Sequence, residues 1–338
     1  MIKTAEQILQ IDTPEKLFTK NNFKLEAKKL QSVWHPDKSK DPLATKVSAH
    51  INLLLALAHN ITDWQTPGIF SFKDVHDKEY VVKYHQCKDL PIGKLYYGKT
   101  TIAYDIPLAN KDLDKNVVNV FLKLANISTG MKAEFDRLIP KVDRSIVTKN
   151  STVYIFKKTE DVIPLSDLLI LTEKLDPKHV AWIGNRLFNL ACFLSHNKLV
   201  YNAFTLDNIW ISAKYHSCLL IGGFWYSTTR GTLISAIPGE LLNFLPKQLK
   251  KDKISHRKYD IIAIKSVLIR LLGDPTAAGT KLIKDTTIPK IMLDFLRFPV
   301  SGDSIKEYQA WEKTVDTSFG KRKFIELNVD ISKLYEEI

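Results

Sequence analysis

The residues from Gly93 to Thr100 follow the pattern G-x-x-x-x-G-K-T, a spacing of glycine and lysine that can hold phosphate groups. In that chemistry a strand precedes the loop, and a helix follows it so that the N-terminal amides of the helix point at the phosphates. The residues that follow, TTIAYDIP, are rich in β-branched and aromatic side chains and stop at Pro107, so they predict a strand and not a helix. We therefore expect Gly98 to lie in a turn between two strands.

A second candidate for chemistry is the basic run KQLKKDKISHRK at residues 247–258, which contains the single acidic residue Asp252. Its cations could bind an acidic protein segment or the phosphates of a nucleic acid. The competing interpretation is a solvated loop that has no partner. The basic residues are Lys247, Lys250, Lys251, Lys253, Arg257 and Lys258.

The composition narrows the class of protein. Of the 338 residues, 45% are hydrophobic and 25% are charged, which excludes a disordered or fibrous chain and predicts about two domains. The net charge of +12 permits an anionic partner without requiring one. The apolar stretches are too short to cross a bilayer and the N-terminus has no secretion signal, so we expect a cytoplasmic protein with no membrane partner. The three cysteines and nine histidines lack ligand spacing, so we expect no metal site.

The first part of the chain predicts a pair of helices. Pro36 ends the first helix because the residue before a proline is pushed out of the α region, which leaves His35-Pro36-Asp37 in a loop. A second helix is expected from Asp41-Pro42 onward, and the two helices should pack together antiparallel. A shorter helix over residues 5–11 would close the groove between them. The apolar residues that recur at helical spacing before the loop are Phe23, Ala27, Leu30 and Trp34.

This hairpin, KLEAKKLQSVWHPDKSKD followed by INLLLALA, resembles the J-domain of DnaJ-type co-chaperones over roughly residues 4–64. In that family the H-P-D loop and the basic face of the preceding helix dock on a DnaK-type heat-shock ATPase and stimulate its ATP hydrolysis. The resemblance implies that Asp37 offers a carboxylate to an arginine of the partner, while Pro36 holds the loop geometry and His35 orients it. The basic face, which would speed association, consists of Lys24, Lys28 and Lys29.

After a boundary near Pro67, short β-type runs dominate to residue 162, and helical periods dominate from Pro164 onward. We expect strands on both sides of Gly98, a third strand over Val117–Ala125, a helix from about Thr129 and a later strand over 152–156. This order resembles the N-lobe of the protein kinase fold, where a strand lysine pairs with a helix glutamate to organise the ATP phosphates. The resemblance implies that Lys123 and Glu134 fill those two positions.

Residues 201–208 follow a long predicted helix, Val180–Leu194, and resemble the kinase catalytic loop H-R-D-x-x-x-x-N. The resemblance makes Asn208 the metal-binding asparagine and Asp260 the aspartate that braces this loop. Ala203 stands where the catalytic aspartate is expected, and Gly223 stands where the metal-binding aspartate of D-F-G is expected. Losing a general base alone costs roughly 10² to 10⁴ in rate, so we expect a pseudokinase and not an enzyme.

The sequence therefore predicts a multidomain protein. A small all-α J-domain hairpin (1–66) precedes an α+β, bilobal kinase-like domain, with a β-rich N-lobe (67–162) and a helical C-lobe with a C-terminal extension (163–338). The expected function is a co-chaperone-like adaptor, in which the J-domain stimulates a DnaK-type ATPase while the kinase-like domain binds or positions a protein client.

Two alternatives to the adaptor stay open. One is an atypical kinase-like enzyme with residual phosphoryl or nucleotidyl transfer, and the other, which we do not favour, is a basic module that binds nucleic acid. The adaptor requires no cofactor, and binding of ATP in the kinase-like pocket is left undecided. The residues that would bind the nucleotide are Gly98, Lys123, Glu134 and Asn208.

Overall fold

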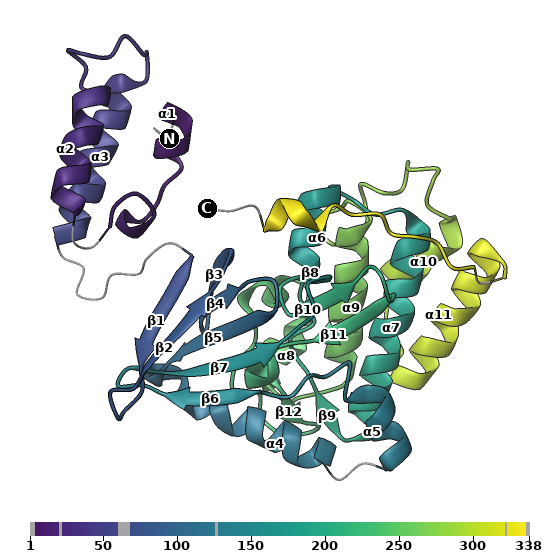
Figure 1. The fold of residues 1–338 in the computed structure, drawn as a ribbon. Helices are drawn as coiled ribbons and strands as arrows, with labels where there is room; N and C mark the ends of the chain where they lie inside the picture. The colour runs from purple at the N-terminus through teal and green to yellow at the C-terminus, as the bar shows by residue number, and fades with distance from the viewer. Residues whose placement is uncertain (1–3, 20–21, 60–67, 126–127, 322, 336–338) are drawn as a thin grey trace. The chain divides into compact units, whose positions relative to one another are not determined.

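The structure is a computed structural model that describes residues 4–19, 22–59, 68–125, 128–321 and 323–335 (Figure 1). The described residues form two compact units, one up to His85 and one from Gln86 onward. Both helices and antiparallel sheets are present, as expected for a multidomain α+β protein. Within the described residues, no helix has both the length and the apolar character that crossing a bilayer requires.

The N-terminal unit contains the predicted helical hairpin, with α2 packed against α3 and the short helix α1 also packed on α3. One hydrophobic cluster joins the three helices, and Ile8, Trp34 and Ile51 are among its buried members. A β-hairpin, which lies beyond the expected boundary at residue 66, completes this unit. The elements are α1 (Ala5–Leu9), η1 (Pro14–Lys16), α2 (Phe23–Trp34), α3 (Ala44–His59), β1 (Ile69–Lys73) and β2 (Glu79–Lys83).

A five-stranded antiparallel sheet opens the C-terminal unit, with the strand order β3-β4-β5-β7-β6. Gly98 lies in the turn between β4 and β5, where its N–H donates to the carbonyl of Thr101 at 2.9 Å, so the predicted strand–turn–strand is confirmed. A strand and not a helix follows the glycine-lysine pattern. The strands are β3 (Gln86–Leu90), β4 (Gly93–Tyr97), β5 (Thr101–Pro107), β6 (Arg144–Val147) and β7 (Ser151–Lys157).

The predicted strand over Val117–Ala125 is wrong, because these residues belong to helix α4 (Asp114–Ala125), which follows η2 (Leu108–Leu113). Val117 and Val120 are buried three positions apart, so the apolar residues lie on one face of a helix and pack on the core. The β-branched valines favour a strand locally, but burial of this face outweighs that preference. Helix α5 (Thr129–Phe135) begins where the sequence predicts it.

The remainder of the C-terminal unit is mainly helical (Figure 1). The long predicted helix is confirmed as α7, which Asp176 caps and which has Pro177 at its first position. The helices are α6 (Leu165–Thr172), α7 (Pro177–His196), α8 (Lys247–Asp252), α9 (Lys258–Leu271), α10 (Lys290–Arg297) and α11 (Ser304–Phe319), with shorter turns at η3 (Phe224–Tyr226), η4 (Gly239–Asn243) and η5 (Ile331–Leu334).

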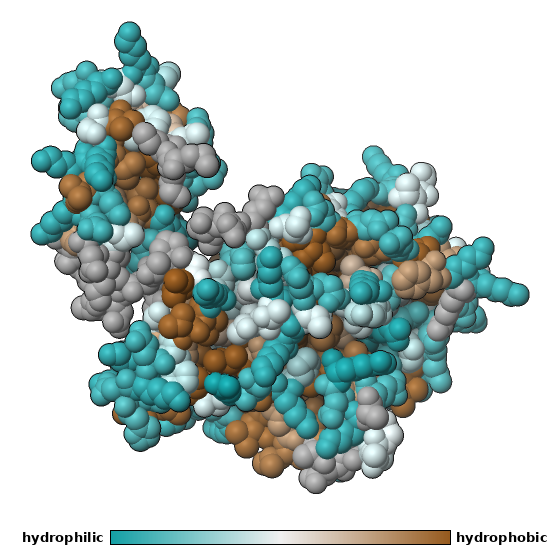
Figure 2. All heavy atoms as spheres, in the orientation of Figure 1, coloured by the Kyte–Doolittle hydropathy of each residue, from teal (hydrophilic) through white to brown (hydrophobic). Residues whose placement is uncertain are grey.

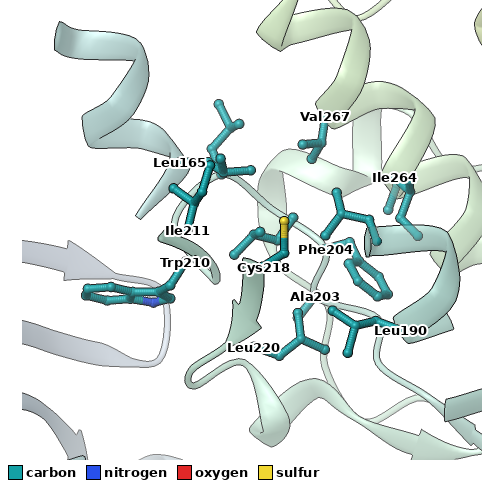
Figure 3. Packing of buried hydrophobic residues seen from close by; sticks show 14 of the residues in the cluster. Leu165, Leu190, Ala203, Phe204, Trp210, Ile211, Cys218, Leu220, Ile264 and Val267 are labelled. Atoms are coloured by element: carbon teal, nitrogen blue, oxygen red, sulfur yellow. The ribbon is translucent and has the colours of Figure 1, made fainter. Parts of the chain in front are cut away.

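Two small antiparallel sheets lie among these helices, with strand orders β11-β10-β8 and β12-β9. Their strands are β8 (Val162–Pro164), β9 (Leu199–Val200), β10 (Ile209–Ser212), β11 (Ser217–Leu220) and β12 (Thr228–Thr229). The segment between β9 and β10 is a loop, yet Ala203 and Phe204 are fully buried against α7 and α9 (Figure 3). This loop is therefore part of the core, and its backbone is fixed by packing.

Candidate functional site

His35, Pro36 and Asp37 form an exposed turn directly after α2. His35 leaves the helix with an extended backbone, as the residue before a proline should, and its carbonyl accepts the N–H of Lys38 at 2.8 Å. The imidazole Nδ1 of His35 accepts the N–H of Asp37 at 3.2 Å and lies 3.6 Å from the Asp37 carboxylate. The Asp37 side chain is 86% exposed, so its carboxylate is accessible to a cationic partner.

A polar contact between α2 and α3 sets the register of the two helices and hence the position of this turn. Gln31 Nε2 donates to the carbonyl of Ser48 and to Asn52 Oδ1, both at 2.9 Å, and the Ser48 hydroxyl donates back to Gln31 Oε1 at 2.7 Å. Ser48 is buried, so breaking this contact would leave polar groups without partners. Sliding one helix along the other is therefore unfavourable.

The lysines of α2 form an exposed basic face on the same helix. Lys24, Lys28 and Lys29 are all exposed, and none forms an ion pair within the part of the chain that the structure describes. Glu26 is the one acidic residue of α2, and its carboxylate is engaged in hydrogen bonds, because it accepts the N–H and the hydroxyl of Thr19. Figure 2 shows that hydrophilic residues flank the apolar strip on the visible face of this unit. The three ammonium groups are therefore available to an anionic surface.

The four residues expected to hold a nucleotide lie on four different segments of the C-terminal unit. No hydrogen bond or ion pair joins any two of them among the described residues. Lys123 lies on α4 and donates from Nζ to the Thr229 hydroxyl at 2.6 Å, and burial, followed by the nearby Lys198, lowers its pKa. Glu134 is exposed on α5, and Gly98 lies in its turn between two strands. The predicted strand-lysine position of Lys123 is thus wrong.

Aromatic side chains fill the space between the five-stranded sheet and the helical part. Trp210 on β10 is fully buried and meets Tyr97 on β4 edge-on, with 5.2 Å between the ring centres. Tyr104 on β5 donates its hydroxyl to the carbonyl of Ile221 at 2.8 Å. Burial raises the pKa of both tyrosines above the usual value, so their hydroxyls stay protonated as donors.

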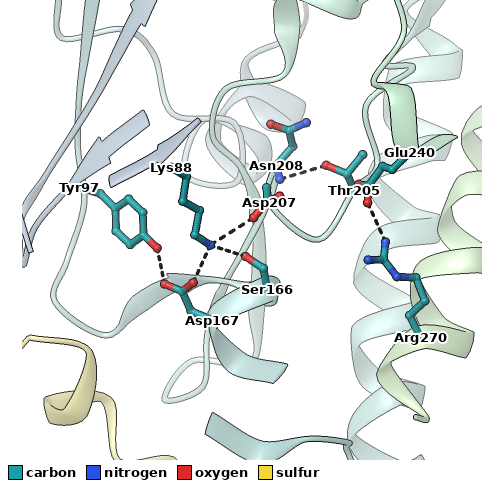
Figure 4. A network of polar contacts seen from close by, with 9 residues as sticks. All are labelled: Lys88, Tyr97, Ser166, Asp167, Thr205, Asp207, Asn208, Glu240 and Arg270. Atoms are coloured by element: carbon teal, nitrogen blue, oxygen red, sulfur yellow. Dashed lines mark hydrogen bonds and ion pairs between the residues drawn. The ribbon is translucent and has the colours of Figure 1, made fainter. Parts of the chain in front are cut away.

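A polar network lies beside these rings and joins the sheet to the helical part (Figure 4). Lys88 on β3 donates to Asp167 at 2.6 Å, to Ser166 at 2.7 Å and to Asp207 at 3.2 Å. The Tyr97 hydroxyl donates to the other oxygen of Asp167, so both oxygens of this buried carboxylate are bonded. Sequence reasoning missed this network, because no local pattern pairs Lys88 with a residue 79 positions away.

Asn208 is buried beside this network, and its side-chain amide points away from the Lys88 amine (Figure 4). Its backbone N–H donates to the Thr205 hydroxyl at 3.3 Å. Among the described residues, no hydrogen bond or ion pair joins Asn208 to Gly98, Lys123 or Glu134.

Asp260 makes the contact that the sequence predicts for it. Its two carboxylate oxygens accept the N–H groups of Tyr201 and Asn202, both at 2.8 Å. Burial raises the pKa of Asp260 to about 7, although the two N–H bonds act in the opposite direction. Ala203 and Gly223 are both buried nearby, and neither carries a group that could transfer a proton or bind a metal. The loop is thus firmly held but has no acid or base at these positions.

The basic run at residues 247–258 is only partly available to a partner. Lys247, Lys251 and Lys253 are exposed, and the side chain of Lys250 lies outside the described residues. Arg257 is engaged, since it pairs with Asp303 at 2.8 Å and donates from Nε to the carbonyl of Gly302; Lys258 is half-buried. The expected patch is therefore smaller than the sequence suggests, which weakens the case for nucleic acid.

Comparison of the chain with models of known protein families finds no match, and a search of curated proteins finds no similar sequence.

Proposed function

We propose that this protein is a co-chaperone-like adaptor whose N-terminal unit acts as a J-domain on a DnaK-type heat-shock ATPase. The observation that carries this proposal is the exposed His35-Pro36-Asp37 turn at the tip of the α2–α3 pair. The turn combines an accessible carboxylate with a fixed backbone, and the helix that leads into it has lysines that form no ion pair with any residue the structure describes. The resemblance to J-domains predicts these features for the surface that docks on the ATPase.

The chemistry of docking follows from these groups. A carboxylate that is 86% exposed can form a paired, charge-assisted contact with a guanidinium group of the partner. The exposed lysines of α2 would attract an acidic surface and raise the association rate more than the final affinity. Bound in this way, the N-terminal unit would stimulate ATP hydrolysis by the partner.

Steady-state ATP hydrolysis by DnaK-type ATPases, with this protein added, tests the proposal. Asp37→Asn preserves the size of the side chain and removes its charge, so we expect it to lose the stimulation. Glu6→Gln removes an equal charge from an exposed position of α1 and should stimulate like the wild type. Stimulation by Asp37→Asn equal to the wild type, or no stimulation of several such ATPases by the wild type, would contradict the proposal.

We further propose that the C-terminal unit is a kinase-like fold without phosphoryl transfer that holds or positions a client. Support comes from the strand order β3-β4-β5-β7-β6 with α4 inserted after β5, and from the contact between Asp260 and the loop that contains Ala203. In this reading the strand before the inserted helix is β5, and its sequence TIAYDIP contains no lysine. On this comparison, the C-terminal unit lacks a lysine, a general base and a metal-binding carboxylate at the positions where a kinase has them.

The filled space between sheet and helices supports the same conclusion. Trp210 and Tyr104 are fully buried between the sheet and the helical part, and a kinase-like fold would bind ATP between these two parts. We expect no transfer of the γ-phosphate to the protein or to added proteins when the chain is incubated with labelled ATP and magnesium. A covalent label that disappears in Lys123→Ala would instead establish the enzyme alternative.

A further inference from the structure

The C-terminal unit carries an extended segment, residues 323–330, that runs from near the end of α11 to η5 (Figure 1). Apolar and polar side chains alternate along it into the first residue of η5. This alternation is typical of an extended chain, in which successive side chains point to opposite sides. One edge of the segment therefore faces the protein and the other faces solvent. The half-buried side chains are Ile325, Leu327, Val329 and Ile331, and the exposed ones are Phe324, Glu326, Asn328 and Asp330.

Apolar side chains hold the middle of this segment to the unit. Leu327, Val329 and Ile331 pack against the main hydrophobic cluster. None of the sheets that the structure describes includes residues 323–330, so no ladder of backbone hydrogen bonds adds to this packing. An extended chain held by half-buried side chains alone opens at a low free energy compared with a packed helix or strand. The middle of the segment can therefore leave the surface while the helices beneath it stay folded.

The far end of the segment is fixed more firmly than its middle. Leu334 and Tyr335 are buried, and Gln86 Nε2 on β3 donates to the carbonyl of Leu334 at 3.0 Å. Lys158 Nζ donates to the Tyr335 hydroxyl at 2.8 Å and lies 5.1 Å from the centre of its ring. Because α11 fixes the other end, the middle can bend outward and return to the same place. The segment therefore covers the surface beneath it reversibly.

The side chains of the segment do not fill all the space beside it. Ile325 lines a cavity of about 530 Å³, together with Trp182 on α7 and Val315 on α11. His216, in the turn between β10 and β11, lines it as well. The space next to Ile325 is large enough for a bigger apolar side chain, such as an aromatic one. This surface therefore fits aliphatic side chains at alternate positions and an aromatic one at the position of Ile325.

We propose that the surface under residues 325–331 binds extended client polypeptides with apolar side chains at alternate positions, and that the protein's own segment competes with them. The segment itself shows which chemistry fits the surface. Unfolded chains expose apolar stretches of this kind, and folded proteins bury them. The surface would thus select unfolded clients. This inference rests on the proposed client-holding function of the C-terminal unit.

Fluorescence anisotropy of labelled peptides mixed with the full-length protein tests the surface. One peptide has the sequence of residues 323–335, KFIELNVDISKLY, and a second has the same composition with its apolar residues grouped in one block. Leu327→Asn with Val329→Asn loosens the resident segment, so the first peptide should bind this variant roughly tenfold more tightly than the wild type. Glu326→Gln with Asn328→Gln changes exposed positions of the same segment and should bind like the wild type. The block peptide should bind each protein roughly tenfold more weakly than the first.

A photoreactive peptide locates the binding and does not depend on any variant. With benzophenone at the position of Ile325, the first peptide should label α7 or α11 of the wild-type protein close to Trp182 or Val315. Labelling elsewhere, equal binding of the block peptide, or no gain in the Leu327→Asn, Val329→Asn variant would overturn the proposal. A dimer of the variant in analytical ultracentrifugation would assign the surface to the segment of a second copy, and would overturn it as well.

Suppression of the aggregation of a denatured protein separates this inference from the function on which it rests. A full-length protein that suppresses aggregation but fails the peptide tests would refute the proposed surface and leave the adaptor standing. A protein that suppresses no aggregation would contradict the client-holding function, and with it this inference. We expect suppression by the wild type and stronger suppression by the Leu327→Asn, Val329→Asn variant.

Discussion

At the scale of single residues, two glycines with nearly the same φ have very different surroundings. Gly222 and Gly231 have φ of +83° and +84°. A Cβ on Gly222 would lie 2.3 Å from the Tyr104 hydroxyl oxygen, whereas a Cβ on Gly231 would meet nothing within 4 Å. The glycine at 222 is thus required by the approach of Tyr104 as well as by its backbone.

We predict that Gly231→Ala lowers the free energy of unfolding by about 1 kcal/mol, from the backbone alone. Gly222→Ala should cost about 1 to 3 kcal/mol more, because overpacking adds to the same strain. Urea unfolding followed by tryptophan fluorescence measures both variants. Equal costs would mean that Tyr104 moves aside freely and does not fix the structure here.

Asp260 gives a pH-dependent prediction. Because burial raises its pKa to about 7, the folded state retains a proton between about pH 4 and 7 that the unfolded state has released. The contribution of this group to stability is therefore greatest below pH 4 and declines as the pH rises to 7. The free energy of unfolding should fall more steeply over this range in the wild type than in Asp260→Asn. Parallel pH profiles would contradict the prediction.

At the scale of elements, the contact between β3 and α6 depends on one buried carboxylate. Asp167 is 2% exposed and bonds to Lys88 and Tyr97, while Asp207 bonds to the same lysine but is 37% exposed. Asp167→Asn should lower the free energy of unfolding by about 2 to 3 kcal/mol, and Asp207→Asn by less than about 1 kcal/mol. Chemical denaturation of the two variants makes the comparison, and a larger loss for Asp207→Asn would refute this ranking.

Some helices of this protein can be predicted from the sequence and others cannot. Helices with a long apolar stripe and clear ends, such as α2 before Pro36 and α7 after Asp176, are predicted well because their signals are local. Helix α4 is not predicted, because its valines favour a strand. The segment forms a helix because its apolar face packs against the core. The network at Lys88 and the cavity at His216 depend on residues far apart in the chain, so no sequence pattern reports them.

At the scale of the whole molecule, the two units have separate hydrophobic clusters with no member in common. We predict two transitions in differential scanning calorimetry. Ile51→Ala in α3 and Leu187→Ala in α7 each remove a fully buried side chain, and each should destabilise only its own unit, by about 2 to 5 kcal/mol. A single transition that shifts as one in both variants would show that the units unfold together.

The aromatic side chains packed around Trp210 also restrict motion of the sheet relative to the helical part of the C-terminal unit. An enzyme that admits and releases a nucleotide must open and close around it on the microsecond to millisecond timescale. Here the Tyr97–Asp167, Lys88–Asp167 and Tyr104–Ile221 bonds span that space and would all have to break together for it to open. The backbone amides of β4, β5 and β10 should therefore be among the slowest in the chain to exchange with deuterium. We therefore expect the sheet and the helices of the C-terminal unit to keep a single conformation. Their outer surface would then present the same shape to a bound molecule at all times.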